Sequence, residues 1–155
     1  MDPRLHGRKI LIAVTPHTAE RMKLVLRGHL VVEMHTVEEA KEALQAHEQA
    51  AIVLGVNFDE SRMFELLRLV RTYDCNRTTP VLCVLDRDSR LSDVAVEGLD
   101  HAVKAMLANA FLNLQKFPDD DEGDARLRRI VDYLILIDGD IHGGFKDVHG
   151  ENVHR

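Results

Sequence analysis

Three acids and one lysine are the residues of this sequence that could do chemistry, because each follows an apolar run. Asp59 follows one such run, and Asp86 and Asp88 follow a second. Lys116 follows a third. Carboxylate oxygens can hold Mg²⁺, and a lysine can bind an anion. The alternative is that all of them are solvated loop residues, which is the usual fate of acids and lysines.

Recognisable metal and cofactor motifs are otherwise missing. His142, His149 and His154 lie near the C-terminus and could supply Zn²⁺ ligands, but their spacings fit no zinc motif. The other histidines are scattered, with no Ser or Cys arrangement that suggests a catalytic triad. The sequence contains neither a P-loop nor a GxGxxG motif. We therefore expect neither a metal nor a cofactor.

The composition is that of an ordinary globular protein. The chain has 155 residues, of which 45% are apolar and 30% charged, and this fits one domain with a full core. A net charge of -6 argues against binding to nucleic acid. No stretch approaches the roughly 20 apolar residues of a membrane span, and the start of the chain has no apolar signal core. The sequence therefore indicates a cytoplasmic protein that binds neither nucleic acid nor membrane.

Short apolar runs alternate with segments of helical periodicity along the chain. The runs predict strands over 9–14, 30–35, 50–56, 81–85 and 110–114. The periodic segments predict helices that follow Thr15 and Ser61 and that span 37–47, 94–107 and 124–137. Such alternation predicts a flavodoxin-like, doubly wound, five-stranded parallel sheet with helices on both faces. We expect this domain over residues 8–137 and a Gly/His-rich tail over 138–155.

Local signals predict where helices begin and which residues form the core. Thr36 and Glu39 form a capping box, and Thr15, Ser61 and Asp124 are expected to cap three other helices. Cys83 lies in an apolar run and is expected to pack as a small hydrophobic residue. The residues predicted to pack against one another are Val53, Phe64, Leu67 and Val84.

In this architecture, ligands bind at the edge formed by the carboxyl ends of the strands. Thr15 and Asn57 lie at that predicted edge, beside the charged candidates. Thr15 also opens a helix, whose positive N-terminal end can bind phosphate. A flavin is disfavoured there, because the loop has no glycine and the chain has no Trp and only two Tyr to stack on the ring.

One stretch of the sequence resembles a known family. FELLRLVRTYDCNRTTPVLCVL, residues 64–85, resembles the third helix and fourth strand of response-regulator receiver domains of the chemotaxis-regulator type. The run at 9–14 resembles the first strand of that family, and 36–44 resembles its second helix. Lys116, near Pro118, resembles the lysine-proline pair after its fifth strand. The matching positions of the best stretch are Glu65-Leu66-Leu67, Val70-Arg71 and Thr79-Pro80-Val81.

The resemblance implies a phosphorylation switch whose reactive groups are mostly missing here. In the family, an aspartate ending the third strand accepts a phosphoryl group, two acids help to hold Mg²⁺, and a hydroxyl and a lysine contact the phosphate. The first three functions fall here on Gly55, on Val14 with Thr15, and on Leu85. Only the lysine has a candidate, Lys116. The resemblance therefore implies a degenerate receiver with no enzymatic activity, unless a displaced residue such as Asp59 accepts the phosphoryl group.

We therefore expect a two-component signalling module that acts by protein–protein contact. Its partner would be a histidine kinase, another signalling protein or a second copy of itself. Leu134, Leu136 and Ile137 are interface candidates, since they extend the apolar surface of the last predicted helix. In the family, dimers often form through a face that corresponds to 94–107, 110–114 and 124–137. The competing class is a domain of the same fold that binds an anion, a nucleotide or a flavin, or that acts as an enzyme.

Overall fold

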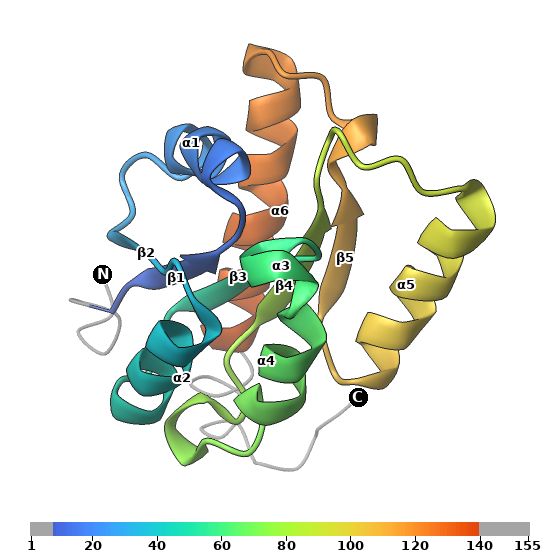
Figure 1. The fold of residues 1–155 in the computed structure, drawn as a ribbon. Helices are drawn as coiled ribbons and strands as arrows, with labels where there is room; N and C mark the ends of the chain where they lie inside the picture. The colour runs from blue at the N-terminus through green and yellow to red at the C-terminus, as the bar shows by residue number, and fades with distance from the viewer. Residues whose placement is uncertain (1–7, 140–155) are drawn as a thin grey trace, which may run out of the picture.

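Five parallel strands form the centre of the structure, a computed structural model that describes residues 8–139 (Figure 1). The strands lie in the order β2-β1-β3-β4-β5, and every neighbouring pair is parallel. Their bounds are β1 (Ile10–Ala13), β2 (Val31–Glu33), β3 (Ala51–Gly55), β4 (Val81–Leu85) and β5 (Ala110–Asn113). The predicted doubly wound sheet is confirmed, with several strands shorter than predicted.

Helices cover both faces of the sheet (Figure 1). Helices α1 and α6 lie on one face, whereas α2, α4 and α5 lie on the other. Their bounds are α1 (Pro16–Val25), α2 (Val37–Ala46), α3 (Phe58–Ser61), α4 (Met63–Val70), α5 (Asp93–Ala105) and α6 (Asp121–Gly139). Two 3-10 turns, η2 (Asp74–Asn76) and η3 (Leu114–Lys116), complete the described elements. Because both faces are covered, the inner strands are apolar along their whole length.

The sheet divides the core into two clusters, and the four residues predicted to pack together are split between them. Val53 and Val84 pack on the side of α1 and α6. Leu67 is buried on the other side with α2 and α4, and Phe64 packs there while only partly buried. The prediction is wrong because successive strand residues point to opposite faces, which places Val53 away from α4. Cys83 is fully buried, as expected, and this burial raises the pKa of its thiol to about 12.

The predicted capping box at the start of α2 is present with one change. The Thr36 hydroxyl accepts a hydrogen bond from the Glu39 N–H at 3.1 Å. The Glu39 carboxylate reaches one residue further back than expected and accepts from the His35 N–H at 2.7 Å. Both bonds satisfy backbone donors that precede the first helical hydrogen bonds, and they set the start of α2.

Two other predicted caps are wrong. Ser61 has a left-handed backbone, with φ 65°, and α4 begins after it without a side-chain cap. Asp124 lies inside α6, and its carboxylate accepts from Arg21 Nε at 2.9 Å. Asp120 performs the capping instead, since its carboxylate accepts from the Gly123 N–H at 2.8 Å. Several acids precede α6 in sequence, so composition alone did not distinguish the capping one.

Helix α6 ends the described part of the chain. It continues to Gly139, so the predicted tail begins with helical residues at 138 and 139. The rest of that predicted tail, including His142, His149 and His154, lies outside the described residues. Neither α6 nor any other helix within 8–139 combines the length and the apolar character of a membrane span.

Replacing Phe58 with alanine is expected to lower the free energy of unfolding by about 3–5 kcal/mol, because its ring is only 1% exposed. Phe64→Ala removes the same ring from a partly buried site, and it should lower the free energy of unfolding by less than about half the loss in Phe58→Ala. Urea unfolding of both variants, followed by circular dichroism, measures the difference. Equal losses would mean that Phe64 fills the core as deeply as Phe58.

Candidate functional site

Three residues singled out in the sequence meet at the carboxyl ends of the strands. Thr15 lies just beyond β1, Asn57 beyond β3 and Asp86 beyond β4. The Thr15 hydroxyl donates to Asp86 Oδ2 at 3.1 Å, and the Asn57 side-chain amide donates to the same oxygen at 3.3 Å. Parallel strands end at one edge, so side chains far apart in sequence form one cluster. We call Thr15, Asn57 and Asp86 the strand-end cluster.

The carboxylate of Asp86 is held on one side only. Its Oδ1 atom is buried and has no hydrogen-bond partner among the described residues. Thr15 occupies the N-cap position of α1, as predicted, but its side chain makes no cap bond, and its hydroxyl donates to Asp86 instead. The Thr18 hydroxyl lies 3.3 Å from that of Thr15 and extends the polar contacts into α1.

Gly55 ends β3 at the position where the receiver resemblance places the phosphoryl acceptor. A Cβ atom at Gly55 would lie 3.1 Å from Cγ1 and 3.2 Å from both Cα and Cβ of Val14. Such distances are tighter than nearly all contacts of real Cβ atoms. Val14 is itself buried, so a side chain at Gly55 would have to displace a packed residue by a few tenths of an ångström. At the position implied for the phosphate-binding hydroxyl, Leu85 is fully buried.

Asp59 lies in an unusual left-handed turn between β3 and α4. Asp59, Glu60 and Ser61 have φ values of 49°, 56° and 65°, a backbone that non-glycine residues rarely adopt. Asp59 Oδ2 accepts from the Val37 N–H at 2.9 Å and from Arg62 Nη1 at 3.0 Å. The side chain therefore caps the start of α2, and its bonds are not with the strand-end cluster.

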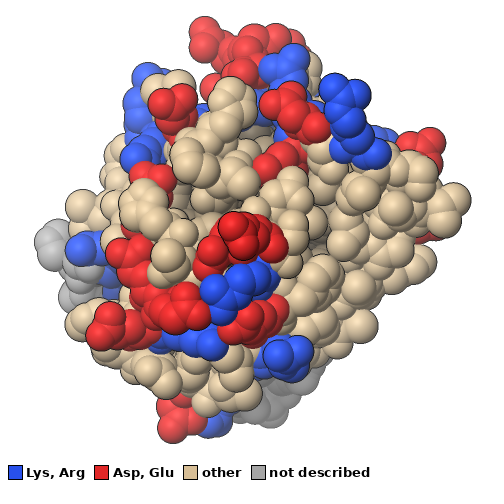
Figure 2. Space-filling model, in the orientation of Figure 1, with Lys and Arg blue, Asp and Glu red and all other residues tan. Residues whose placement is uncertain are grey.

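Arg62 joins three acids around this turn. It contacts Asp59, and its Nη2 lies 2.7 Å from a Glu38 oxygen and 2.9 Å from a Glu65 oxygen. Hydrogen bonds from Arg62 and Lys41 lower the pKa of Glu65 to about 2. The bond to Arg62 also lowers the pKa of Glu38, while Glu65 and Glu38 raise the pKa of Arg62. Figure 2 shows these acids as a red patch with blue groups among them, over α2, α3 and α4.

Lys116 lies apart from the strand-end cluster. It is exposed on η3 and lines a surface groove between α5 and β5 together with Asp93, Glu97 and Asp100. Within the described part of the chain, it makes no hydrogen bond or ion pair with Asp86. The acids around it make this groove a poor site for an anion.

The acids that were considered as possible metal ligands, Asp59, Asp86 and Asp88, do not come together. Asp86 and Asp59 have different partners, and Asp88 is exposed. Within residues 8–139, no group of three or more His, Cys, Asp or Glu side chains is placed to hold a metal ion. A divalent cation needs several oxygen ligands at once, and the side chains at this edge offer one carboxylate.

Two arginines with clear roles were missed by the sequence analysis. Arg62 had an available signal, because Asp59 and Glu65 lie three residues on either side of it. Arg21 is nine-tenths buried and bonds to Phe117 and to residues beyond it. Those partners lie about a hundred residues away, at separations of 96 to 103, and no local pattern could reveal them.

Known proteins resemble this chain in structure, whereas the sequence comparisons find no match. No protein-family model matches the sequence, and no curated protein matches it. A response regulator from Hahella chejuensis superposes with a TM-score of 0.67 at 17% identity, covering 85% of this chain and 98% of that one. The receiver domain of a sensor histidine kinase from Pseudomonas aeruginosa, solved with a magnesium ion in its active-site cleft, gives 0.63 at 19% identity, covering 84% and 98%.

An adenylate cyclase structure from Rhodopirellula baltica is similar as well. Its TM-score is 0.65 at 11% identity, and the match covers 94% of this chain and 99% of that one. Fold likeness at such identities does not carry function with it. The chain has the fold of response-regulator receiver domains, as the resemblance of residues 64–85 implied.

Proposed function

We propose that the chain is a receiver-like signalling module that takes no phosphoryl group at the usual position and acts by protein–protein contact. The observation that carries this proposal is the close packing of Val14 against Gly55, with Cβ-to-atom distances of 3.1 and 3.2 Å for any side chain added there. The acceptor position has no carboxylate, and any side chain placed there would have to push Val14 aside by a few tenths of an ångström.

The surrounding residues support the same conclusion. A carboxylate that attacks a phosphoryl donor needs a cation to offset the charge of the incoming group. Val14 and Thr15 stand where the resemblance places the cation's ligands, and neither is acidic. Asp59 Oδ2 is bonded to Val37 and Arg62, and these bonds hold the carboxylate at the start of α2, away from the strand-end cluster.

A contact surface is available on α5 and the end of α6. Of the residues of α5, only Val103 is fully buried, and Val94 is 78% exposed. Leu136 on α6 is 61% exposed, whereas Leu134 and Ile137 are partly buried. The visible surface over α5 carries few charges (Figure 2). We propose that this side of the domain meets a histidine kinase, another signalling protein or a second copy of the chain.

Incubation with acetyl phosphate and Mg²⁺ is expected to leave the intact mass of the chain unchanged, because Gly55 offers no nucleophile and no acid pair holds the metal. Asp59→Asn and Asp86→Asn variants serve as matched controls. A phosphoryl adduct on the intact chain that disappears in either variant would identify a displaced acceptor and contradict the proposal.

Gly55→Ala is expected to destabilise the fold by about 1–3 kcal/mol, since its Cβ must push against Val14. Gly98→Ala is the control, because a Cβ at this α5 position meets nothing within 4 Å, and it should stabilise the helix by about 0.5–1 kcal/mol. Chemical denaturation measures both values. A Val14→Ala change should offset part of the Gly55→Ala loss, and additive losses in the double variant would refute the contact.

Sedimentation of the intact chain is expected to show self-association at high micromolar concentration, unaffected by phosphodonor or Mg²⁺. Val94→Glu and Leu136→Glu should each weaken it, because a charge in an apolar contact must be desolvated. Leu30→Glu is the matched control, since Leu30 is 55% exposed just before β2, at the opposite edge of the sheet from β5. A chain that stays monomeric at this concentration leaves only a foreign partner for this surface.

A further inference from the structure

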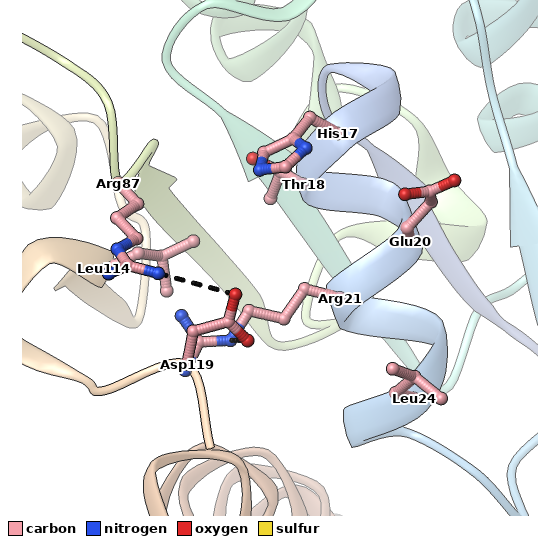
Figure 3. Close-up of a pocket in the computed structure, with 8 residues that line it drawn as sticks. All are labelled: His17, Thr18, Glu20, Arg21, Leu24, Arg87, Leu114 and Asp119. Atoms are coloured by element: carbon pink, nitrogen blue, oxygen red, sulfur yellow. Dashed lines mark hydrogen bonds and ion pairs between the residues drawn. The ribbon is translucent and has the colours of Figure 1, made fainter.

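A small pocket lies between α1, η3 and the loop that follows β4 (Figure 3). Its volume is about 160 Å³, below the range of roughly 300–1,000 Å³ typical of sites for drug-sized ligands. It therefore suits a small ion or the end group of a larger molecule. The lining residues are His17, Thr18, Glu20, Arg21, Leu24, Arg87, Leu114 and Asp119.

Arg21 lines this pocket and has one guanidinium nitrogen without a hydrogen-bond partner among the described residues. Its side chain is only 9% exposed. Nε donates to Asp124 at 2.9 Å, and Nη2 donates to the carbonyl oxygens of Phe117 and Pro118 at 3.0 and 2.6 Å. Nη1 is buried and has no partner among the described residues. A buried donor on a charged group is costly to leave without an acceptor, so an acceptor at Nη1 would be bound favourably.

Asp119 lies between two arginines, with a long hydrogen bond from Arg87 and a more distant ion pair with Arg21. One of its oxygens is 3.4 Å from Arg87 Nη1, and the other is 3.8 Å from Arg21 Nε. Figure 3 shows Arg21 reaching from α1 and Arg87 from the opposite side towards this carboxylate. Asp119 and Arg87 are each about half exposed, at 51% and 55%, so both side chains can move. The Asp119 carboxylate thus lies where the guanidinium groups of Arg21 and Arg87 would attract any other anion.

The first turn of α1 adds further attraction for negative charge. It carries no acidic residue, and the positive end of the helix dipole lies there. His17 and Thr18 of this turn line the pocket, and the Thr18 hydroxyl can donate to a ligand oxygen. Once Asp119 moves out, Glu20 is the one acid left among the lining residues, against the cations Arg21 and Arg87.

We propose that this pocket binds a phosphate-type dianion between Arg21 and Arg87, with Asp119 displaced into solvent. Arg21 keeps its bonds to Asp124 and to the two carbonyl groups and offers Nη1 to the anion. Arg87 closes over the anion from the loop, and the first turn of α1 lies beside it. This site is separate from Gly55 and does not depend on how the module signals.

Titration of the full chain with inorganic phosphate, by calorimetry at constant ionic strength, tests the proposal. Asp119→Asn removes the competing carboxylate and should tighten phosphate binding by about tenfold, and Arg87→Gln should weaken it by about tenfold. Arg90→Gln is the matched control, because Arg90 is exposed on the same loop and does not line the pocket. Its affinity should stay within about twofold of the intact chain. The Arg21 Nε–H signal in ¹H–¹⁵N spectra should shift during the titration.

Two results would overturn the proposal. One is the absence of phosphate binding to Asp119→Asn at millimolar concentration, and the other is an equal loss of affinity in Arg87→Gln and Arg90→Gln. Phenyl phosphate distinguishes the sources of the anion. Binding as tight as that of inorganic phosphate supports recognition of a phosphate group on a larger molecule, whereas binding of inorganic phosphate alone supports a site for the free ion.

Discussion

The tight contact between Val14 and Gly55 constrains the packing at the carboxyl ends of the central strands. Val14 follows β1 and packs tightly against Gly55, the last residue of the neighbouring strand β3. An added Cβ would press on both the side chain and the backbone of Val14, and the backbone of a central strand has little freedom to retreat. The polar groups at this edge therefore lie beside the packed pair of Val14 and Gly55. Thr15 and Asn57 both donate hydrogen bonds to Asp86 there.

The fold could be read from the sequence because each element left a strong local signal. Apolar runs without polar interruptions indicated strands buried on both faces, and the match over residues 64–85 indicated the family whose fold this is. Because these runs are apolar throughout, they do not show which side of the sheet each side chain faces. Val53 and Phe64 were therefore assigned to one cluster, although the sheet separates them. The capping residue of α6 was missed for a related reason, since neighbouring acids gave equivalent signals.

The sequence predicted which residues lie at the site, but it did not predict how they contact one another. Thr15, Asn57 and Asp86 were named because they follow predicted strands, but which of them touch depends on the path of each loop. Asp59 was named on the same ground and is directed elsewhere by a left-handed turn without glycine, a conformation that no residue preference indicates. The role of Arg21 rests on partners from the other end of the domain, which only the assembled fold brings near.

The left-handed turn also places backbone strain in the loop after β3. A left-handed residue other than glycine costs roughly 1–2 kcal/mol, and three follow one another here. Asn57, before the turn, is tied to Asp86, while Asp59, within it, is tied to the first N–H of α2. The strained segment is thus held at both ends, by the edge of the sheet and by the start of α2. The loop after β3 therefore links the start of α2 to the carboxyl end of β4 through two side chains that lie two residues apart.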